Sequence, residues 1–343
     1  MVNSRNRLLL DCTLRDGGYV NNWEFDTSTA LHICDALYVS GVRYIELGLV
    51  GRGGVPGKTT KFSSFDEIKP LLKDRRWDCR YCVMITQAEL SASRLEIPPR
   101  GETTVDMIRI AYFKAEEQDA LSSAYVLKKK GYEVFLQAMA TFMYTEDELS
   151  AMLEKVNRIQ PAAFYIVDSF STMYNDDVRQ MADFVLTHLE ENILFGFHAH
   201  NNIQMAYSNA ITFMNMQTER TLIIDGSIFG MGRGAGNVPL ELLMEYANKK
   251  LGGHYDISAV LTACEQYIAP IFKENYWGYS IPYLLTASNK INSVYGWYLR
   301  QKGITTSKDI NTILERIPEN LRYTLARDTV DRVIADYFEE KSI

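Results

Sequence analysis

The sequence predicts an α/β protein built as a (β/α)8, or TIM, barrel followed by a helical extension. Eight apolar runs of strand length occur between residues 8 and 225, and segments with helical periodicity separate them. The alternation stops near residue 249, and the rest of the chain is helical in pattern. A doubly wound open sheet is the alternative, but it usually has fewer strands, and no Gly-x-Gly-x-x-Gly follows the first run. We therefore predict a barrel over residues 1–248 and an extension over residues 249–343.

Each element is assigned from its pattern and its boundaries. The helix expected over 25–40 is typical, because Asp26 can cap it, Ile33 and Leu37 share one face, and Gly41 ends it. The first strand begins at Leu8, and the others are expected at 42–48, 79–85, 106–111, 133–138, 163–168, 193–198 and 221–225. The remaining helices between strands are expected at 65–72, 116–130, 147–159, 176–189 and 203–214. After a linker at 251–254, the extension is expected to contain helices at 257–272, 281–302, 306–317 and 329–338.

Composition excludes several classes of function. The chain has 343 residues, of which 47% are hydrophobic and 23% charged, as in ordinary globular proteins. A net charge of -7 argues against a nucleic-acid partner, which needs a basic surface. No apolar run is long enough for a membrane span, and the short polar start does not resemble a signal peptide, so we expect a cytoplasmic protein with no membrane contact. The five cysteines, including a Cys79-x-x-Cys82 pair within a strand, are expected to be reduced thiols.

The end of the first strand carries charges that a barrel core would not tolerate unpaired. Arg15 and Asp16 follow the apolar run, and Gly17 and Gly18 come next. Desolvating either charge alone is costly, so both should face a polar cavity at the carboxyl end of the strand. The two glycines allow a sharp turn and a close approach to a ligand.

Two histidines end the seventh strand. His198 and His200 lie two residues apart, so a strand directs both imidazoles to one face. Satisfied polar histidines are an equally good interpretation of this pattern alone. If the face is the barrel interior, Asp16 can converge with the imidazoles, and two histidines with one carboxylate leave open positions on a divalent cation.

A glycine-rich loop follows the eighth strand. It runs from Asp225 to Asn237 and contains Arg233 and five glycines, namely Gly226, Gly230, Gly232, Gly234 and Gly236. Such a loop can bind phosphate, can bring Asn237 to a cation, or can simply make tight turns. Arg15 is similarly open to two interpretations. It can stabilise a developing enolate oxygen, which we favour, or it can form a salt bridge with Asp16 or Glu46.

Three stretches together resemble one family, the DRE-TIM metallolyases or HMG-CoA-lyase-like group. Residues 11–17 (DCTLRDG) look like its D-x-T-L-R-D-G signature. Residues 198–202 (HAHNN) and 232–237 (GRGAGN) resemble its H-x-H-N strand and its G-x-G-x-G-N loop, in the same order. The resemblance implies a TIM barrel that binds a divalent cation, Mn²⁺ or Mg²⁺. The implied ligands are Asp16, His198 and His200, with Asn237 as a fourth ligand or near neighbour, and Arg15 would stabilise an enolate.

Within that family the chain is most similar to the 4-hydroxy-2-oxovalerate aldolases. Residues 197–206 resemble that branch, and its members also carry a helical extension. The similarity implies a class II pyruvate aldolase, a lyase that cleaves or forms a 4-hydroxy-2-oxo acid through a metal-bound pyruvate enolate. Its partners would be a small 2-oxo acid and an aldehyde, and we assign Glu46, Gly234 and Tyr295 to substrate binding.

One departure bears on the substrate. The aldolases place a histidine base a few residues after Arg-Asp-Gly, whereas this chain has Gly18 and Tyr19 there. A phenol with its ordinary pKa of about 10 is a poor base at neutral pH. Tyr19 is therefore predicted to be catalytic with help from the cation or a water. The alternatives are a base elsewhere or a different substrate, such as a larger polar aldehyde bound along residues 19–23.

Two other functions remain open at this point. One is a Claisen condensing enzyme of the isopropylmalate or homocitrate synthase type that uses acetyl-CoA, although the tail is short for a regulatory domain. The other is a degenerate, non-catalytic barrel that serves as a scaffold. We also expect a homo-oligomer. The aldolases dock a partner dehydrogenase on their extension, but the divergent tail gives that partner no support here.

Overall fold

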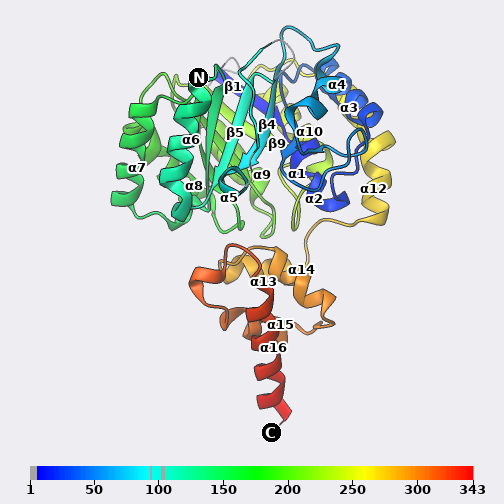
Figure 1. Cartoon of the computed structure of the whole chain (residues 1–343), viewed down its shortest axis with the longest axis vertical. Helices are drawn as coiled ribbons and strands as arrows, with labels where there is room; N and C mark the ends of the chain where they lie inside the picture. Colours follow the sequence, from blue (N-terminus) through cyan, green and yellow to red (C-terminus); the bar gives the residue numbers. More distant parts are fainter. Residues whose placement is uncertain (1–5, 93–94, 102–104, 343) are drawn as a thin grey trace.

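The computed structural model describes residues 6–92, 95–101 and 105–342, and it contains a closed parallel barrel with a smaller helical unit beyond one end (Figure 1). Neighbouring strands follow the order β1-β9-β8-β7-β6-β5-β4-β2, and β1 also pairs with β2, which closes the barrel. The pairings are parallel throughout, and the short β3 adds to the outer side of β2. The predicted barrel is therefore confirmed, although residues 1–5 of its predicted span lie outside the described residues.

The strands and helices alternate around the barrel as the pattern predicts. The strands are β1 (Arg7–Asp11), β2 (Tyr44–Val50), β3 (Lys61–Phe62), β4 (Arg80–Thr86), β5 (Met107–Tyr112), β6 (Glu133–Met139), β7 (Ala163–Asp168), β8 (Leu194–Ala199) and β9 (Leu222–Gly226). The helices up to the last strand are α1 (Thr13–Asp16), α2 (Gly18–Asn21), α3 (Thr27–Val39), α4 (Lys69–Leu72), α5 (Gln87–Ala92), α6 (Glu117–Lys129), α7 (Glu146–Ile159), α8 (Asn175–His188) and α9 (Ala206–Met214). The later helices are α10 (Leu240–Lys250), α11 (Ile257–Ala263), α12 (Ala269–Glu274), α13 (Ile281–Ser288), α14 (Val294–Gln301), α15 (Ser307–Glu315) and α16 (Arg327–Ser342).

Some helices differ from the sequence prediction. Helices α5 and α10 were not predicted, and the single helix expected over 281–302 is two helices, α13 and α14. The interruption has a cause in Asn292, whose side chain donates to the Tyr323 carbonyl at 2.7 Å and accepts from the Val294 backbone N–H at 3.1 Å. These bonds hold the turn between α13 and α14 in place of helical backbone bonds.

The two largest apolar cores of the described residues place the boundary between barrel and extension after residue 248. Side chains of α11 and its continuation, such as Val260 and Ile268, belong to the same core as the barrel helices. A second core contains Ile291, Tyr295 and Ile313 of the extension. Helix α12 accordingly lies beside the barrel, and α13 to α16 lie beyond its end (Figure 1). The boundary between cores thus follows α12, because α11 packs on α3 rather than on the later helices.

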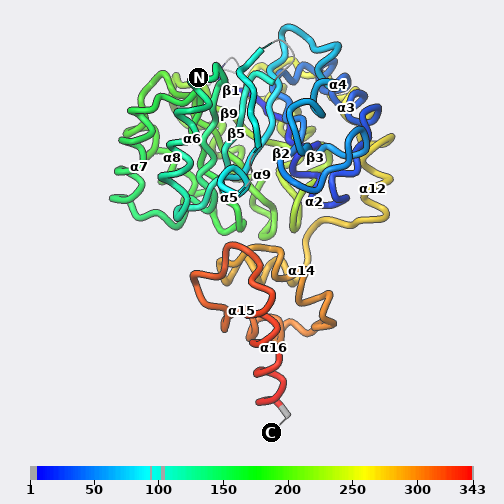
Figure 2. The backbone as a smooth tube through the Cα atoms, in the orientation of Figure 1, coloured from blue at the N-terminus to red at the C-terminus, as the bar shows by residue number. Residues whose placement is uncertain are grey.

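The extension covers the end of the barrel at which the strands finish. Phe113 follows β5 and Phe170 follows β7, and their rings lie 5.3 and 6.2 Å from the ring of Tyr323 in the extension. The backbone trace shows the same arrangement, with the extension lying directly below the loops at this end of the barrel and α14 on its near side (Figure 2). The carboxyl ends of the strands are where active sites form in this fold, so the extension is placed to form part of the site. No described helix has the combination of length and apolar character that crossing a membrane requires.

A glycine on β8 makes room for an aromatic ring inside the barrel. A Cβ at Gly196 would lie 2.3 Å from ring atoms of Tyr165, closer than real contacts allow. The Tyr165 ring in turn lies under the guanidinium of the fully buried Arg109, 5.0 Å from its centre. Gly196 therefore leaves room for the Tyr165 ring, and that ring contacts the buried guanidinium of Arg109.

We expect Gly196→Ala to lower the free energy of unfolding by about 1–3 kcal/mol, because the added methyl must displace a packed ring. Denaturant unfolding followed by circular dichroism measures the change. Ser122→Ala, on the exposed face of α6, is the matched control and should change stability by less than about 0.5 kcal/mol. Equal stability of Gly196→Ala and the wild type would contradict this account of the barrel interior.

Candidate metal centre and active site

Three predicted ligands meet at the carboxyl end of the barrel. β8 delivers His198, and His200 follows directly, so the alternation of the strand sends both imidazoles inward. Asp16 comes from α1, immediately after β1. Its Oδ2 lies 3.1 Å from Nε2 of His198 and 4.0 Å from Nε2 of His200. All three side chains are almost completely buried.

The donor atoms of this cluster fit a divalent cation. One ligand atom from each of Asp16, His198 and His200 lies within 4.8 Å of the others. Oδ1 of Asp16 and Oδ1 of Asn237 are buried without a hydrogen-bond partner among the described residues, so both oxygens are available as ligands. Imidazole nitrogen with carboxylate and amide oxygen suits Mn²⁺, Mg²⁺ and related divalent cations. The residues therefore fit the predicted metal site.

A second group of potential ligands shares His198. Cys12 and Asp225 lie on the other side of its ring. Asp225 already forms an ion pair with Arg109, and Sγ of Cys12 donates to the Gly226 carbonyl at 3.3 Å. Burial also raises the pKa of the Cys12 thiol, which disfavours the thiolate that a metal binds. Asp16, His198 and His200 are thus the better cation site.

Asp225 instead orients His198. Its Oδ2 lies 2.9 Å from Nδ1 of the imidazole, which leaves Nε2 facing Asp16. A carboxylate behind a ligating histidine fixes the ring and raises its basicity. Sequence reasoning included Asp225 in the glycine-rich loop but gave it no role. Its place at the end of the eighth strand, beside the barrel interior, was the available signal.

A chain of buried ion pairs connects these residues through the barrel. Arg109 on β5 pairs with Asp225 and, through Nη1, with Oε2 of Glu46 at 2.9 Å. The same Glu46 oxygen accepts from Nε of Arg15 at 2.8 Å, and Nη1 of Arg15 lies 2.9 Å from Asp16. Glu46 is therefore enclosed between two guanidiniums and positions them, which differs from the predicted contact with substrate. Arg109 was missed, since a lone arginine within an apolar strand run carries no motif.

Arg15 forms both salt bridges that the sequence left as its alternative role, and it still has a free donor. The short helix α1, rather than an extended strand end, brings Arg15 and Asp16 together. Gly18 permits this turn to pack, because a Cβ there would lie 2.0 Å from the Trp23 indole, whose Nε1 donates to the Arg15 carbonyl at 2.7 Å. Nη2 of Arg15 is buried with no partner among the described residues. That group is free to bind a substrate oxygen.

Burial and the neighbouring charges keep two of the three candidate ligands, Asp16 and His200, unprotonated. Burial alone would raise the pKa of Asp16, but the Arg15 guanidinium and both imidazoles hold that pKa well below its ordinary value. Burial, with repulsion from Arg233, keeps the pKa of His200 well below its ordinary value. Burial also acts to lower the pKa of His198, but the hydrogen bonds to Asp16 and Asp225 outweigh it and raise that pKa. Asp16 and His200 therefore present free lone pairs at neutral pH.

The glycine-rich loop brings Asn237 to the cluster. Residues His200 and Asn237 form an isolated antiparallel bridge. A Cβ at Gly232 would lie 2.4 Å from Nδ2 of Asn237, and one at Gly234 would lie 2.6 Å from Oδ1 of Asn202. Glycine at these positions lets the loop close over the amide, while Nδ2 of Asn237 donates to the Met231 carbonyl at 3.1 Å and leaves Oδ1 free.

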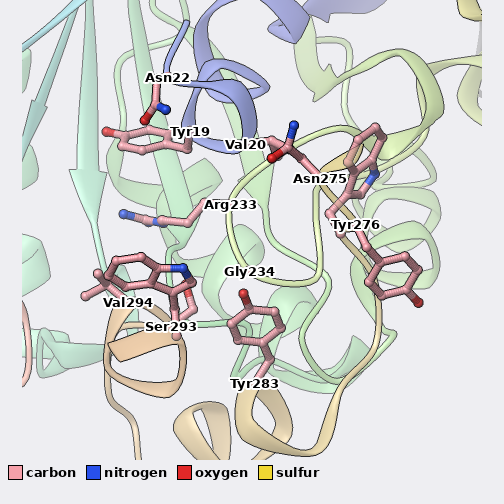
Figure 3. A pocket seen from close by; sticks show the side chains of 13 residues that line it. Tyr19, Val20, Asn22, Arg233, Gly234, Asn275, Tyr276, Tyr283, Ser293 and Val294 are labelled. Carbon is pink, nitrogen blue, oxygen red and sulfur yellow. The ribbon is translucent and has the colours of Figure 1, made fainter. Parts of the chain in front are cut away.

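A cavity beside the cluster is lined by α2, the glycine-rich loop and the extension. Tyr19, which is 41% exposed, and Gly234 lie on its wall (Figure 3). Trp297 of α14 also lines the cavity. Tyr19 packs edge-on against Trp23 at 4.6 Å. The structure does not bring Tyr295 into this site, because its ring is fully buried in the core of the extension and its hydroxyl donates to the Thr324 carbonyl at 2.9 Å.

The loop after β7 supports His200 from behind. Oγ of Ser171 donates to the His200 carbonyl at 2.8 Å. The carboxylate of Asp168 holds that loop by accepting from the backbone N–H groups of Thr172 at 2.8 Å and Met173 at 3.2 Å. Burial nevertheless raises the pKa of Asp168 to about 7.

The comparisons with known proteins agree on one family. The model of the HMGL-like family matches residues 7–265. An oxaloacetate decarboxylase of Mycobacterium tuberculosis is 26% identical over 255 residues, which is 73% of this chain and 72% of that protein. A 4-hydroxy-2-oxovalerate aldolase of Thermomicrobium roseum is 28% identical over 266 residues, covering 76% and 72%. The crystal structure of the N-terminal domain of a proposed aldolase from Bacteroides vulgatus aligns with a TM-score of 0.72 at 27% identity, covering 85% of this chain and 96% of that one.

We expect Asp225→Asn to weaken Mn²⁺ binding about 10–100-fold, because loss of the carboxylate loosens His198 and lowers its basicity. The intensity of the electron paramagnetic resonance signal of free Mn²⁺ measures binding directly. Asp176→Asn, an exposed substitution in α8, is the matched control. Unchanged affinity in a folded Asp225→Asn protein would show that Asp225 does not act through His198.

The raised pKa of Asp168 predicts a pH dependence of stability. The folded protein holds this proton up to about pH 7, whereas the unfolded chain releases it near pH 4. Stability should therefore fall as the pH rises from about 4 to 7, by up to about 1.4 kcal/mol per pH unit for this group. Asp168→Asn should remove the part of this decline in stability that comes from Asp168. The part that comes from Asp11, whose pKa is likewise raised to about 7, should remain. Denaturant unfolding at pH 5, 6 and 7 tests this, and identical slopes would contradict it.

Proposed function

The chain belongs to the HMGL-like family, whose model matches residues 7–265 of 343, and from this premise we propose that it is a divalent-cation-dependent aldolase that cleaves or forms a 4-hydroxy-2-oxo acid. Its relatives named above are an aldolase and a decarboxylase, so they support a lyase-type enzyme in general. The single observation that carries the finer proposal is the convergence of Asp16, His198 and His200 beside the free donor of Arg15.

The proposed reaction breaks the bond between C3 and C4 of the 2-oxo acid. The electron pair stays with C3, the 4-hydroxyl loses its proton, and the products are an aldehyde and the enolate of pyruvate, which then takes a proton at C3. A divalent cation, when bound, would supply Lewis-acid polarisation of the substrate oxygens. Nη2 of Arg15 would donate a hydrogen bond to the oxygen on which negative charge develops.

Arg15 is well suited to this role because it cannot move away. Its Nε and Nη1 are held by Glu46 and Asp16, and its side chain is 5% exposed. A fixed donor in a water-poor site stabilises developing charge without a reorganisation cost during the reaction. Arg109 holds Glu46 on the opposite side, so it is a positioning residue rather than a catalytic one.

Tyr19 is our candidate for handling the proton of the 4-hydroxyl. It follows the Arg-Asp-Gly stretch and lines the cavity that opens beside the metal centre. One intervening water would carry the proton, so the Tyr19 phenol need not act as the sole base.

Decarboxylation of oxaloacetate is a second candidate, and one observation favours it. It breaks the equivalent C3–C4 bond and releases CO₂, so there is no hydroxyl proton to remove. The other described histidines do not supply a base to the site: His32 stacks on Tyr267, His188 stacks on Phe184, and His254 follows α10. A site with no imidazole other than His198 and His200 suits a reaction that needs no base.

We expect the purified protein with Mn²⁺ to release pyruvate from at least one 4-hydroxy-2-oxo acid, and to lose activity more than about 100-fold in a chelator or in Asp16→Asn. Pyruvate formation is followed with 4-hydroxy-2-oxovalerate, with longer 4-hydroxy-2-oxo acids and, separately, with oxaloacetate. Asp176→Asn is again the control. Activity that persists in the chelator would contradict the proposal, and turnover of oxaloacetate alone would select the decarboxylase.

A further inference from the structure

The cavity beside the candidate metal centre is lined by a positively charged side chain, Arg233, to which the proposed reaction gives no role. It has a volume of about 370 Å³ and lies between the barrel end and helices α13 and α14. Arg233 is the charged side chain among the described residues that line it. Figure 3 shows the Arg233 side chain extending into the cavity between Tyr19 and the start of α14, where Ser293 and Val294 lie.

Arg233 differs from the other arginines of the site in having no anionic partner. Arg15 and Arg109 each pair with two carboxylates. Arg233 has no carboxylate within ion-pair distance in the described part of the chain, and its buried Nε–H has no acceptor there. Its contacts are the face of the Tyr19 ring, 5.4 Å away, and Nε2 of His200, 3.4 Å away. A partly buried guanidinium left in this state is costly unless an anion joins it.

Even the contact with His200 is absent when that imidazole ligates a cation. The ring nitrogen then gives its lone pair to the metal, so Nη2 of Arg233 has no acceptor there. The charge of the site also changes. The three buried carboxylates of the centre exceed its two paired guanidiniums by one negative charge, and a divalent cation with one pyruvate anion makes this group neutral. The charge of Arg233 remains to be balanced.

We propose, on the basis of the proposed function, that the aldehyde partner of pyruvate carries an anionic group, a carboxylate or a phosphate, and that Arg233 binds it. Guanidinium binds either oxyanion through paired hydrogen bonds. The rings of Tyr19 and Trp297 would contact the carbon chain, and the polar side chains of Asn22 and Tyr283 also line the cavity. In the aldol addition C3 of pyruvate loses a proton and bonds to the aldehyde carbon, whose oxygen gains a proton. The anionic group therefore serves binding alone.

Matched pairs of aldehydes test this inference in the presence of pyruvate and Mn²⁺. Succinic semialdehyde is compared with butanal, and glyceraldehyde 3-phosphate with glyceraldehyde. We expect kcat/KM to be at least about tenfold higher for the charged member of one pair, and that pair identifies carboxylate or phosphate. Arg233→Gln should bring the ratio within a pair close to one, and Arg233→Lys should retain part of it. Arg158→Gln, an exposed arginine on α7, should leave the ratio unchanged.

A binding measurement keeps the inference testable without turnover. Trp277 and Trp297 line the cavity, so tryptophan fluorescence reports its occupancy. Succinate and glycerol 3-phosphate are the anionic probes, and glycerol is the neutral one. We expect one anion to change the fluorescence with an affinity that falls about tenfold or more in Arg233→Gln, while glycerol has no such effect.

Two results would overturn the inference. One is equal binding of the anionic probes by the wild type and Arg233→Gln. The other is an Arg233→Gln protein whose KM for pyruvate rises while its aldehyde preference is unchanged, because Arg233 would then hold pyruvate itself. Anion binding that depends on Arg233 in a protein with no aldolase activity would instead reject the proposed function and leave the anion site standing.

Discussion

The site depends on one constraint, namely that every charge inside the barrel must find a partner. Arg109 has no exposed surface, and it is tolerated because Glu46 and Asp225 neutralise it from two sides. The same carboxylates reach onward, Asp225 to His198 and Glu46 to Arg15. Removing one member would leave a buried charge uncompensated, at a cost of about 3–5 kcal/mol. The network that neutralises the buried charges therefore also fixes the geometry of the candidate metal ligands.

Small residues determine whether that network can form. Gly196 leaves space for the Tyr165 ring beneath Arg109, and Gly18 leaves space for the Trp23 indole beside the turn that holds Arg15. Gly232 allows the loop to close over Asn237. At each position the requirement is close approach of a side chain rather than flexibility. This explains why glycines cluster near the charged residues, where large rings and guanidiniums have to pack together.

The barrel could be predicted from the sequence, because eight apolar runs separated by helical segments fit few other folds. The convergence of Asp16 with His198 and His200 could also be predicted, because the two histidines share a strand face. Arg109 and the role of Asp225 could not, since their partners lie 63 and 116 residues from Arg109 and only the closed barrel brings them together. Tyr295 was predicted to bind substrate, but its ring is buried in the core of the extension. The break between α13 and α14 depends on a side-chain bond to Tyr323, which periodicity does not report.

The residues assigned to the proposed chemistry and those that line the cavity differ in how strongly a substitution would destabilise the fold. Arg15 and the candidate metal ligands are buried and connected by ion pairs, so most substitutions there would destabilise the fold. Tyr276 and Trp297, which line the cavity and follow the barrel in the chain, are 68% and 46% exposed. Changes at such positions usually cost less than about 0.5 kcal/mol. For the proposed aldolase reaction, the extension therefore supplies a wall that can vary with the aldehyde, while the barrel residues assigned to the bond-breaking step stay the same. The guanidinium of Arg233 contacts His200 of the candidate metal centre and also lines the cavity, so it lies where the two meet.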